Sequence, residues 1–66
     1  MDIADVAKRV KDIEQGKWDD EVAHSDEDSL YRDLLSAIAD GTCTDPAACA
    51  ALALTTQELE FARWCA

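Results

Sequence analysis

Four side chains of the sequence are of the types that hold zinc in proteins: His24, Cys43, Cys49 and Cys65. Together they would form a site of three cysteines and one histidine, and a metal staple would help to stabilise a chain of 66 residues. No two of the cysteines have the tight C-x-x-C spacing that is typical of structural zinc sites. We therefore expect neither a metal nor another cofactor, and interpret the cysteines as small thiol side chains. A disulfide between Cys43 and Cys49 is the alternative.

Catalysis finds little support in the sequence. His24 is the single histidine, and it lies in an acidic stretch without a serine or cysteine motif that a general base would serve. Paired carboxylates are too frequent in this chain to mark an acid–base site, and no glycine-rich loop is present that would hold a phosphate. We predict that the protein is not an enzyme.

Aspartates recur at seven-residue steps along much of the chain, at Asp5, Asp12, Asp19, Asp26, Asp33 and Asp40. Residues 1–17 hold four acids and four bases, whereas residues 19–60 hold eleven acids and one base, Arg32. The formal net charge of −9 therefore falls almost wholly on the last two-thirds of the chain. Such a surface repels nucleic acid and anionic membranes and attracts a basic protein.

The first two of these aspartates belong to a predicted amphipathic helix. Apolar residues recur at three- and four-residue steps between residues 3 and 13, and the next glycine stands where such a helix would end. Asp5 and Asp12 lie away from the apolar stripe, and each has Lys8 or Arg9 three or four residues along the chain. We expect both aspartates to form ordinary solvated ion pairs within the helix.

A second helix is predicted to begin at Ser25, which is a good N-cap with Asp28 at the capping-box position. The preceding segment "KWDDEVAH" shows no clear period and is interpreted as a loop, in which Trp18 and Val22 pack against the helices. The predicted buried stripe of this helix consists of Leu30, Leu34, Ala37 and Ile38, widened by Tyr31 and Leu35, and Gly41 ends the helix.

An acidic edge follows from the seven-residue steps in this second helix. Seven residues turn an α-helix about 20° short of two full turns, so Asp26, Asp33 and Asp40 share one edge at spacings of about 10.5 Å. None of the three has a base three or four residues away, and we therefore expect them to be unpaired. The predicted partner-binding residues are these three together with Asp19, Asp20 and Glu21.

The last third of the chain predicts one or two further helices. Asp45, followed by a proline, is a strong N-cap and predicts an alanine-rich helix that runs to about Leu54. Thr55 with Glu58 three residues later predicts a capping box that opens a last helix. One continuous helix over residues 46–65 is the alternative, which the two successive threonines disfavour.

Two helices joined by a short turn have the outline of a DNA-binding helix-turn-helix, in which Gln57 and Arg63 would contact the DNA. The recognition helix would be net negative, whereas DNA-binding surfaces place lysine and arginine on phosphates. Sequence-specific DNA binding is therefore kept as the alternative function.

The chain is short enough to form a single domain, residues 1–66, and its periodicities predict an all-α fold. We expect a small bundle of three to four helices, with a helix-turn-helix-like pair at its C-terminal end. The sequence has no run of about 20 apolar residues and no start typical of a signal peptide. Three cysteines, an odd number, fit a reducing compartment, so we expect a cytoplasmic protein without membrane contact.

The segments "DSLYRDLLSAIADG", "DPAACAALAL" and "LEFARWCA" resemble short uncharacterised proteins that phages and prophages of actinobacteria encode. The resemblance covers roughly residues 25–66 and rests on a leucine and alanine pattern with the terminal "FARWCA". It implies a phage-type cytosolic protein, and it assigns no activity and no functional residue.

The favoured hypothesis is a small acidic helical module that binds a basic protein. In a phage context the expected form is inhibition of a host protein, with DNA mimicry as one version. Besides the DNA-binding regulator, a structural or oligomeric phage protein without an inhibitory role is an alternative. The identity of the partner and the oligomeric state are left open, and a small homo-oligomer is compatible with the sequence.

Overall fold

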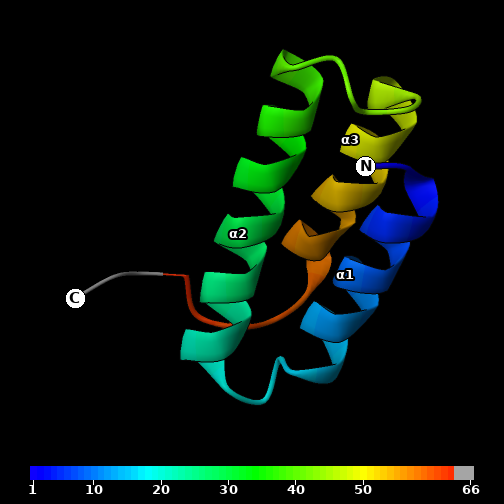
Figure 1. Ribbon diagram of the computed structural model, residues 1–66. Helices are drawn as coiled ribbons and strands as arrows, with labels where there is room; N and C mark the ends of the chain where they lie inside the picture. Colours follow the sequence, from blue (N-terminus) through cyan, green and yellow to red (C-terminus); the bar gives the residue numbers. More distant parts are fainter. Residues whose placement is uncertain (64–66) are drawn as a thin grey trace.

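The computed structural model describes residues 1–63, which form helices and connecting segments without any β-strand. These residues contain α1 (Ile3–Gln15), α2 (Asp20–Ala39), α3 (Pro46–Leu54) and η1, a turn of 3-10 helix (Thr55–Glu58). The three α-helices lie side by side, and each contacts the other two (Figure 1). The predicted all-α fold is confirmed for this part of the chain.

Helix α1 follows the prediction closely. Its N-terminus is a capping box, in which the Asp2 carboxylate accepts from the Asp5 backbone N–H at 2.9 Å and the Asp5 carboxylate accepts from the Asp2 N–H at 3.0 Å. Val6 and Ile13 of the apolar stripe are fully buried, and Gly16 ends the helix. The expected ion pair of Asp5 with a neighbouring base is replaced by this cap, because its carboxylate faces the end of the helix.

Helix α2 begins six residues earlier than predicted. Asp19 is its N-cap and accepts from the Val22 backbone N–H at 3.2 Å, while Asp20 and Glu21 occupy the first turn. The prediction of a loop over residues 17–24 is therefore wrong for its second half, and Ser25 lies inside the helix. Aspartate is as good an N-cap as serine, and two acids in the first turn are favoured by the helix dipole.

The earlier start of α2 changes which side chains are buried. Its buried residues follow one another at four- and three-residue steps: Ala23, Glu27, Leu30, Leu34 and Ala37. Glu27 is the one charged residue in this otherwise apolar series. Trp18 is 84% exposed and Leu35 is 67% exposed, so the predicted packing of both side chains is wrong. Val22 and Ile38 are also exposed.

Helix α3 begins as predicted, with Asp45 as the N-cap and proline in the first turn. It ends at Leu54, where the hydroxyls of Thr55 and Thr56 donate to carbonyls of the last helical turn at 2.6 and 3.0 Å. The predicted break is thus confirmed against one continuous helix.

The predicted last helix is wrong within the described residues. After η1, residues 59–63 belong to no helix and run past α2 (Figure 1). A helix-turn-helix pair is therefore not formed by the residues that the structure describes. We call residues 59–63 the C-terminal segment.

The hydrophobic core is small, as expected for a chain of this length. Its large buried side chains are Val6, Ile13, Leu30 and Leu34, and the remaining members are alanines and Cys49. No helix among residues 1–63 combines the length and the apolar character that a membrane span requires.

Candidate protein-binding site

A shallow hollow of about 160 Å³ lies between α1 and α2 and is lined by Arg9, Asp12, Ile13 and Asp26. We call it the α1–α2 hollow. Two carboxylates and one guanidinium surround an apolar side chain that is itself buried. The two aspartates come from different helices, so the packing of α1 on α2 brings them to one place.

Arg9 links the two helices beside this hollow. Its Nη1 donates to Asp33 Oδ2 at 2.8 Å, and Arg32 Nε lies 3.7 Å from the other oxygen of the same carboxylate. The hydrogen bond from Arg9 holds the pKa of Asp33 below its usual value. The prediction that Asp33 is unpaired is therefore wrong, because Arg9 comes from the neighbouring helix and Arg32 is the adjacent residue, and neither lies three or four residues away.

Asp12 and Asp26 differ in their charge partners. Lys8 Nζ donates to Asp12 Oδ2 at 2.9 Å, which confirms the expected pair within α1. Asp26 is exposed and forms no ion pair with any lysine or arginine of residues 1–63. Of the three carboxylates of Asp12, Asp26 and Asp33, that of Asp26 is thus the one that no lysine or arginine of the described residues pairs.

The other acids of the predicted partner-binding surface lie elsewhere. Asp19 is the N-cap of α2, and Asp20 Oδ1 accepts from the Ala62 backbone N–H at 3.2 Å. Asp40 caps the opposite end of α2 and accepts from the Thr42 hydroxyl at 2.6 Å and the Thr42 N–H at 3.1 Å. These hydrogen bonds lower the pKa of Asp40. Of the predicted six, Glu21 and Asp26 are the exposed acids of α2 without a capping bond or an ion pair to lysine or arginine in the described chain.

A second polar cluster, which the sequence did not predict, lies under the C-terminal segment. Glu27 is 2% exposed, and its Oε1 accepts from Arg63 Nε at 2.8 Å. Arg63 Nη2 also donates to Glu27 Oε2 at 3.2 Å and to the carbonyls of Thr56 and Leu59 at 2.6 and 3.1 Å. The guanidinium stacks on Phe61, 3.9 Å from the ring centroid. We call the Glu27–Arg63 interaction the clamp.

The charged groups of the clamp are hydrogen-bonded within the protein. Burial tends to raise the pKa of Glu27, but hydrogen bonds from Arg63 and Thr56 together with the positive charge of Arg63 hold the pKa below its usual value. The Tyr31 hydroxyl lies 2.5 Å from Thr56 Oγ1 and 3.5 Å from Glu27 Oε2. No buried side-chain nitrogen or oxygen in the described residues lacks a hydrogen-bond partner. This arrangement holds the C-terminal segment to α2.

One signal in the sequence could have revealed the clamp. Glu27 stands between Ala23 and Leu30 at core spacing, where a charged residue requires a buried counter-ion. After Arg32, the next base along the chain is Arg63. Pairing this core carboxylate with Arg63, the one base after residue 32, is thus a prediction that the sequence permits.

The residues considered for zinc are not gathered in the part of the chain that the structure covers. His24 Nε2 lies 3.3 Å from Asp28 Oδ2, on the N-terminal half of α2. The thiols of Cys43 and Cys49 both donate to the Thr44 carbonyl, at 3.8 and 3.3 Å, and both are free rather than joined in a disulfide. Burial is the main reason that the pKa of Cys49 is raised.

Residues 1–63 contain no group of three histidine, cysteine or acidic side chains arranged to hold a metal ion. Cys65, the fourth residue considered for zinc, lies outside the described residues.

The two residues considered for DNA binding are engaged within the protein. Gln57 Nε2 donates to the Tyr31 hydroxyl at 2.9 Å, and Arg63 belongs to the clamp. Neither side chain lies on a helix of the kind that enters a DNA groove, because residues 55–58 form a 3-10 turn and residue 63 lies outside any helix.

In comparisons with models of protein families, with curated proteins and with solved structures, nothing matches this chain. We therefore infer its function from the chemistry of its surface.

Proposed function

We propose that this protein is a small acidic protein-binding module that receives a basic side chain of a protein partner in the α1–α2 hollow. The observation that carries the proposal is Asp26, an exposed carboxylate that lines the same hollow as Asp12 and has no lysine or arginine partner in residues 1–63. A lysine or arginine placed in the hollow would pair with Asp26 and form charge-assisted hydrogen bonds. The buried side chain of Ile13 beneath would exclude water from one side of the contact.

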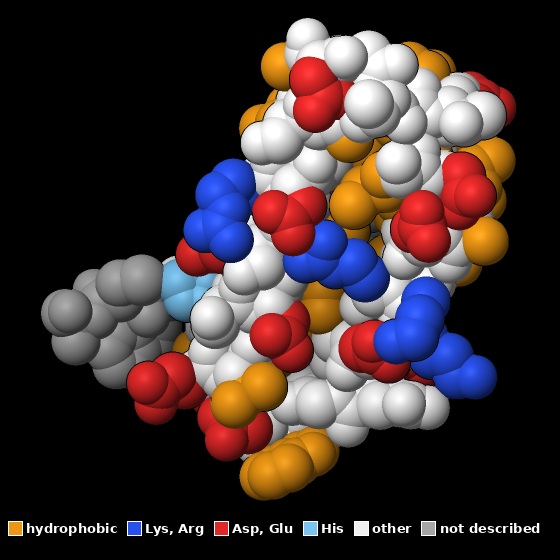
Figure 2. Space-filling view, in the orientation of Figure 1, with side chains coloured by type: hydrophobic (Ala, Val, Ile, Leu, Met, Phe, Trp, Pro, Cys, Tyr) orange, Lys and Arg blue, Asp and Glu red, His pale blue; other side chains and the backbone are white. Residues whose placement is uncertain are grey.

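The charge of the whole chain supports the same kind of partner. A net charge of −9 on 66 residues produces a negative field that speeds the approach of a basic protein. Figure 2 shows acidic side chains spread over α1 and α2 on one face, with a few basic side chains between them. The field thus favours encounter over a broad area, while the hollow supplies one defined contact.

Inhibition of a basic host protein, as the phage resemblance suggests, is one form that such binding would take. Extended DNA mimicry gains less support than capture of a single basic side chain. Asp26, Asp33 and Asp40 are about 10.5 Å apart along α2, whereas phosphates are about 3.4 Å apart along each DNA strand. In addition, Asp33 forms an ion pair with Arg9, and the Asp40 carboxylate accepts a hydrogen bond from the Thr42 hydroxyl.

The experiment compares three immobilised baits in a pull-down from host lysate: the wild-type protein, Asp26→Asn and Glu60→Gln. Both variants remove one exposed negative charge, but Glu60 does not line the α1–α2 hollow. We expect basic proteins to be retained at low salt by the wild type and Glu60→Gln, and at least about threefold less by Asp26→Asn. Retention should fall at high salt for all baits, because salt screens exposed charges beyond about 3 Å at 1 M.

Circular dichroism of each bait checks that its helices are intact. Equal retention of basic proteins by Asp26→Asn and Glu60→Gln would show that only net charge matters and that the hollow is not the site. Asp33→Asn is not a suitable variant, because it would release Arg9 and place a free positive charge beside the hollow.

A further inference from the structure

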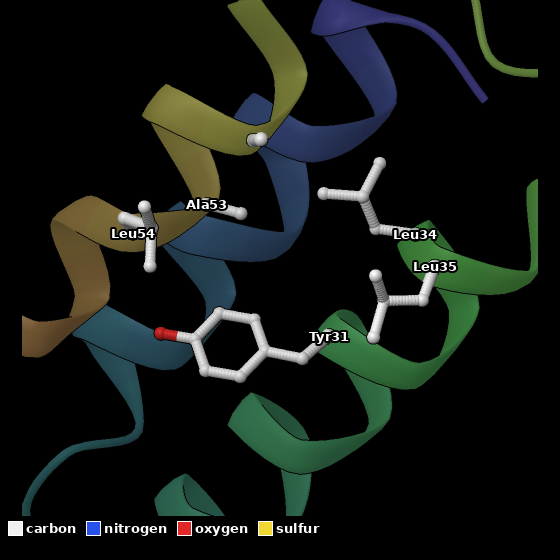
Figure 3. A pocket seen from close by; sticks show the side chains of 6 residues that line it. Tyr31, Leu34, Leu35, Ala53 and Leu54 are labelled. Atoms are coloured by element: carbon white, nitrogen blue, oxygen red, sulfur yellow. The ribbon is translucent and has the colours of Figure 1, made fainter. Parts of the chain in front are cut away.

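An apolar groove runs between α2 and α3, away from the acids of the α1–α2 hollow. It encloses about 280 Å³ and is lined by Tyr31, Leu34, Leu35, Ala50, Ala53 and Leu54. Figure 3 shows Tyr31, Leu34 and Leu35 projecting from α2 toward Ala53 and Leu54 on α3. Leu35 is 67% exposed and Leu54 is 60% exposed, so each wall of the groove carries a leucine that stands out into solvent.

Helix α3 beside the groove has no polar side chain. Its nine residues are proline, alanine, cysteine and leucine, and several of them face solvent. An α-helix that is apolar on every side is normally buried, whereas a surface helix carries a polar outer stripe. The outer side of α3 therefore has the composition of a helix that is covered.

The exposed apolar surface is large compared with the core. Among residues 1–63, four large aliphatic side chains are buried. Six large hydrophobic side chains are exposed: Ile3, Trp18, Val22, Leu35, Ile38 and Leu54. Leu35 and Leu54 border the groove, and Ile38 follows one turn after Leu34 on α2. A short chain with so small a core gains stability from burying such a face in an oligomer.

We propose that two copies of this chain form a dimer through the groove between α2 and α3. The charge distribution favours a second copy over a basic partner at this place. The six lining residues are uncharged, although 32% of the chain is charged. Two molecules that each carry −9 repel one another least when they meet at an uncharged face, whereas a basic partner gains more from the acids of the α1–α2 hollow.

The shape of the face fits contact with itself. A twofold axis pairs the same surface of both copies, and this face offers both a hollow and a projecting leucine, so Leu35 of one copy would enter the groove of the other. Alanines on α3 allow close approach of the facing helices, and no large polar side chain of α3 stands in the way.

The size of the face predicts a weak dimer. Helix α3 is about 14 Å long, and two neighbouring helices span about 20 Å, so the face measures about 300 Å² in projection. Stable interfaces take about 800 Å² from each partner, so we expect a weak dimer that dissociates reversibly on dilution. The α1–α2 hollow shares helix α2 with the groove but none of its lining residues, so the hollow stays open in this dimer.

Sedimentation equilibrium of the purified full chain tests the proposal between about 1 μM and about 1 mM. We expect the mass to rise from 7.2 kDa toward twice that value as concentration increases. The dimer should be tighter at about 1 M than at about 0.05 M sodium chloride, since salt screens the repulsion between the acidic copies. Salt acts in the opposite direction on a basic partner, which separates this test from the one for the α1–α2 hollow.

The variants Leu35→Gln and Leu54→Gln remove the projecting leucines without changing the net charge, and Val22→Gln is the matched control outside the groove. We expect each groove variant to raise the dissociation constant at least about tenfold and the control to leave it unchanged. Circular dichroism confirms that each variant keeps its helices. A mass of 7.2 kDa at every concentration would overturn the proposal and leave the groove to another protein's helix. A dimer that Val22→Gln weakens and the groove variants do not would also overturn it.

Discussion

Glu27 is a buried carboxylate whose charge is balanced by Arg63 alone among the bases of the described chain. Removing one partner of a buried ion pair leaves the other charge buried without a counter-ion. The stability lost is larger than the stability that the intact pair adds over a pair of apolar side chains of similar size. We expect Glu27→Gln to lower the free energy of unfolding by about 2–4 kcal/mol. This is a large part of the about 3–10 kcal/mol typical of a chain this size. Urea denaturation at pH 7, followed by circular dichroism, measures the change.

The double variant Glu27→Leu/Arg63→Met serves as the control, because it leaves no unpaired charge and should recover much of the loss. The wild type should also lose stability in acid. The folded state holds the pKa of Glu27 below its usual 4.5, so the contribution of the clamp is complete above pH 4.5 and disappears as the pH falls through the lower value. Glu27→Gln should show a weaker loss of stability below pH 4.5. An unfolding curve of Glu27→Gln identical to that of the wild type would contradict the role of the clamp.

Local spacing predicted one ion pair and missed another, for a physical reason. Asp12 and Lys8 are one helical turn apart, so the sequence alone brings them together. Asp33 and Arg9 are separated by 24 residues, and their contact depends on how α1 packs against α2. Counting bases at three and four residues cannot detect such a partner. Asp33, the middle residue of the predicted acidic edge, is therefore paired in the folded protein.

The start of α2 offers a test at the level of one element, because two residues are competing N-caps. Asp19→Ala should cost about 1 kcal/mol, since it removes the acceptor for the Val22 N–H. Ser25 is an exposed residue inside the helix. Ser25→Ala should therefore leave the free energy of unfolding unchanged or raise it by up to about 0.5 kcal/mol. Thermal or urea unfolding of both variants measures the difference. A loss for Ser25→Ala without a loss for Asp19→Ala would place the helix start at residue 26 instead.

Helix boundaries were predictable where strong local signals act without competition. The segment from Asp45 to Leu54 has a cap, a proline in the first turn and a run of alanines, and it forms the helix that these features predict. The segment after Thr55 has residues of good helix propensity but forms a single 3-10 turn and then leaves the helix, because Arg63 reaches Glu27 and three backbone carbonyls. Tertiary contacts outweigh propensities that amount to a few tenths of a kcal/mol per residue.

The molecule as a whole has a small core, a high negative charge and an apolar groove between α2 and α3. Periodicity and length are enough to predict an all-α fold, since apolar stripes at helical spacing need no knowledge of partners. The α1–α2 hollow could be predicted only in part, because Asp12 and Asp26 meet through packing between helices. Net charge indicated the kind of partner, while the position of the contact required the arrangement of α1 on α2.

The clamp joins residues that are 36 positions apart in the sequence, whereas α1 and α2 are connected by a turn of a few residues. Closing the longer loop costs more chain entropy, so we expect α1 and α2 to pair early in folding and the C-terminal segment to dock after the transition state. Interactions that form after the transition state alter the unfolding rate and leave the folding rate nearly unchanged. The clamp would then set how long each folded molecule persists rather than how quickly it forms.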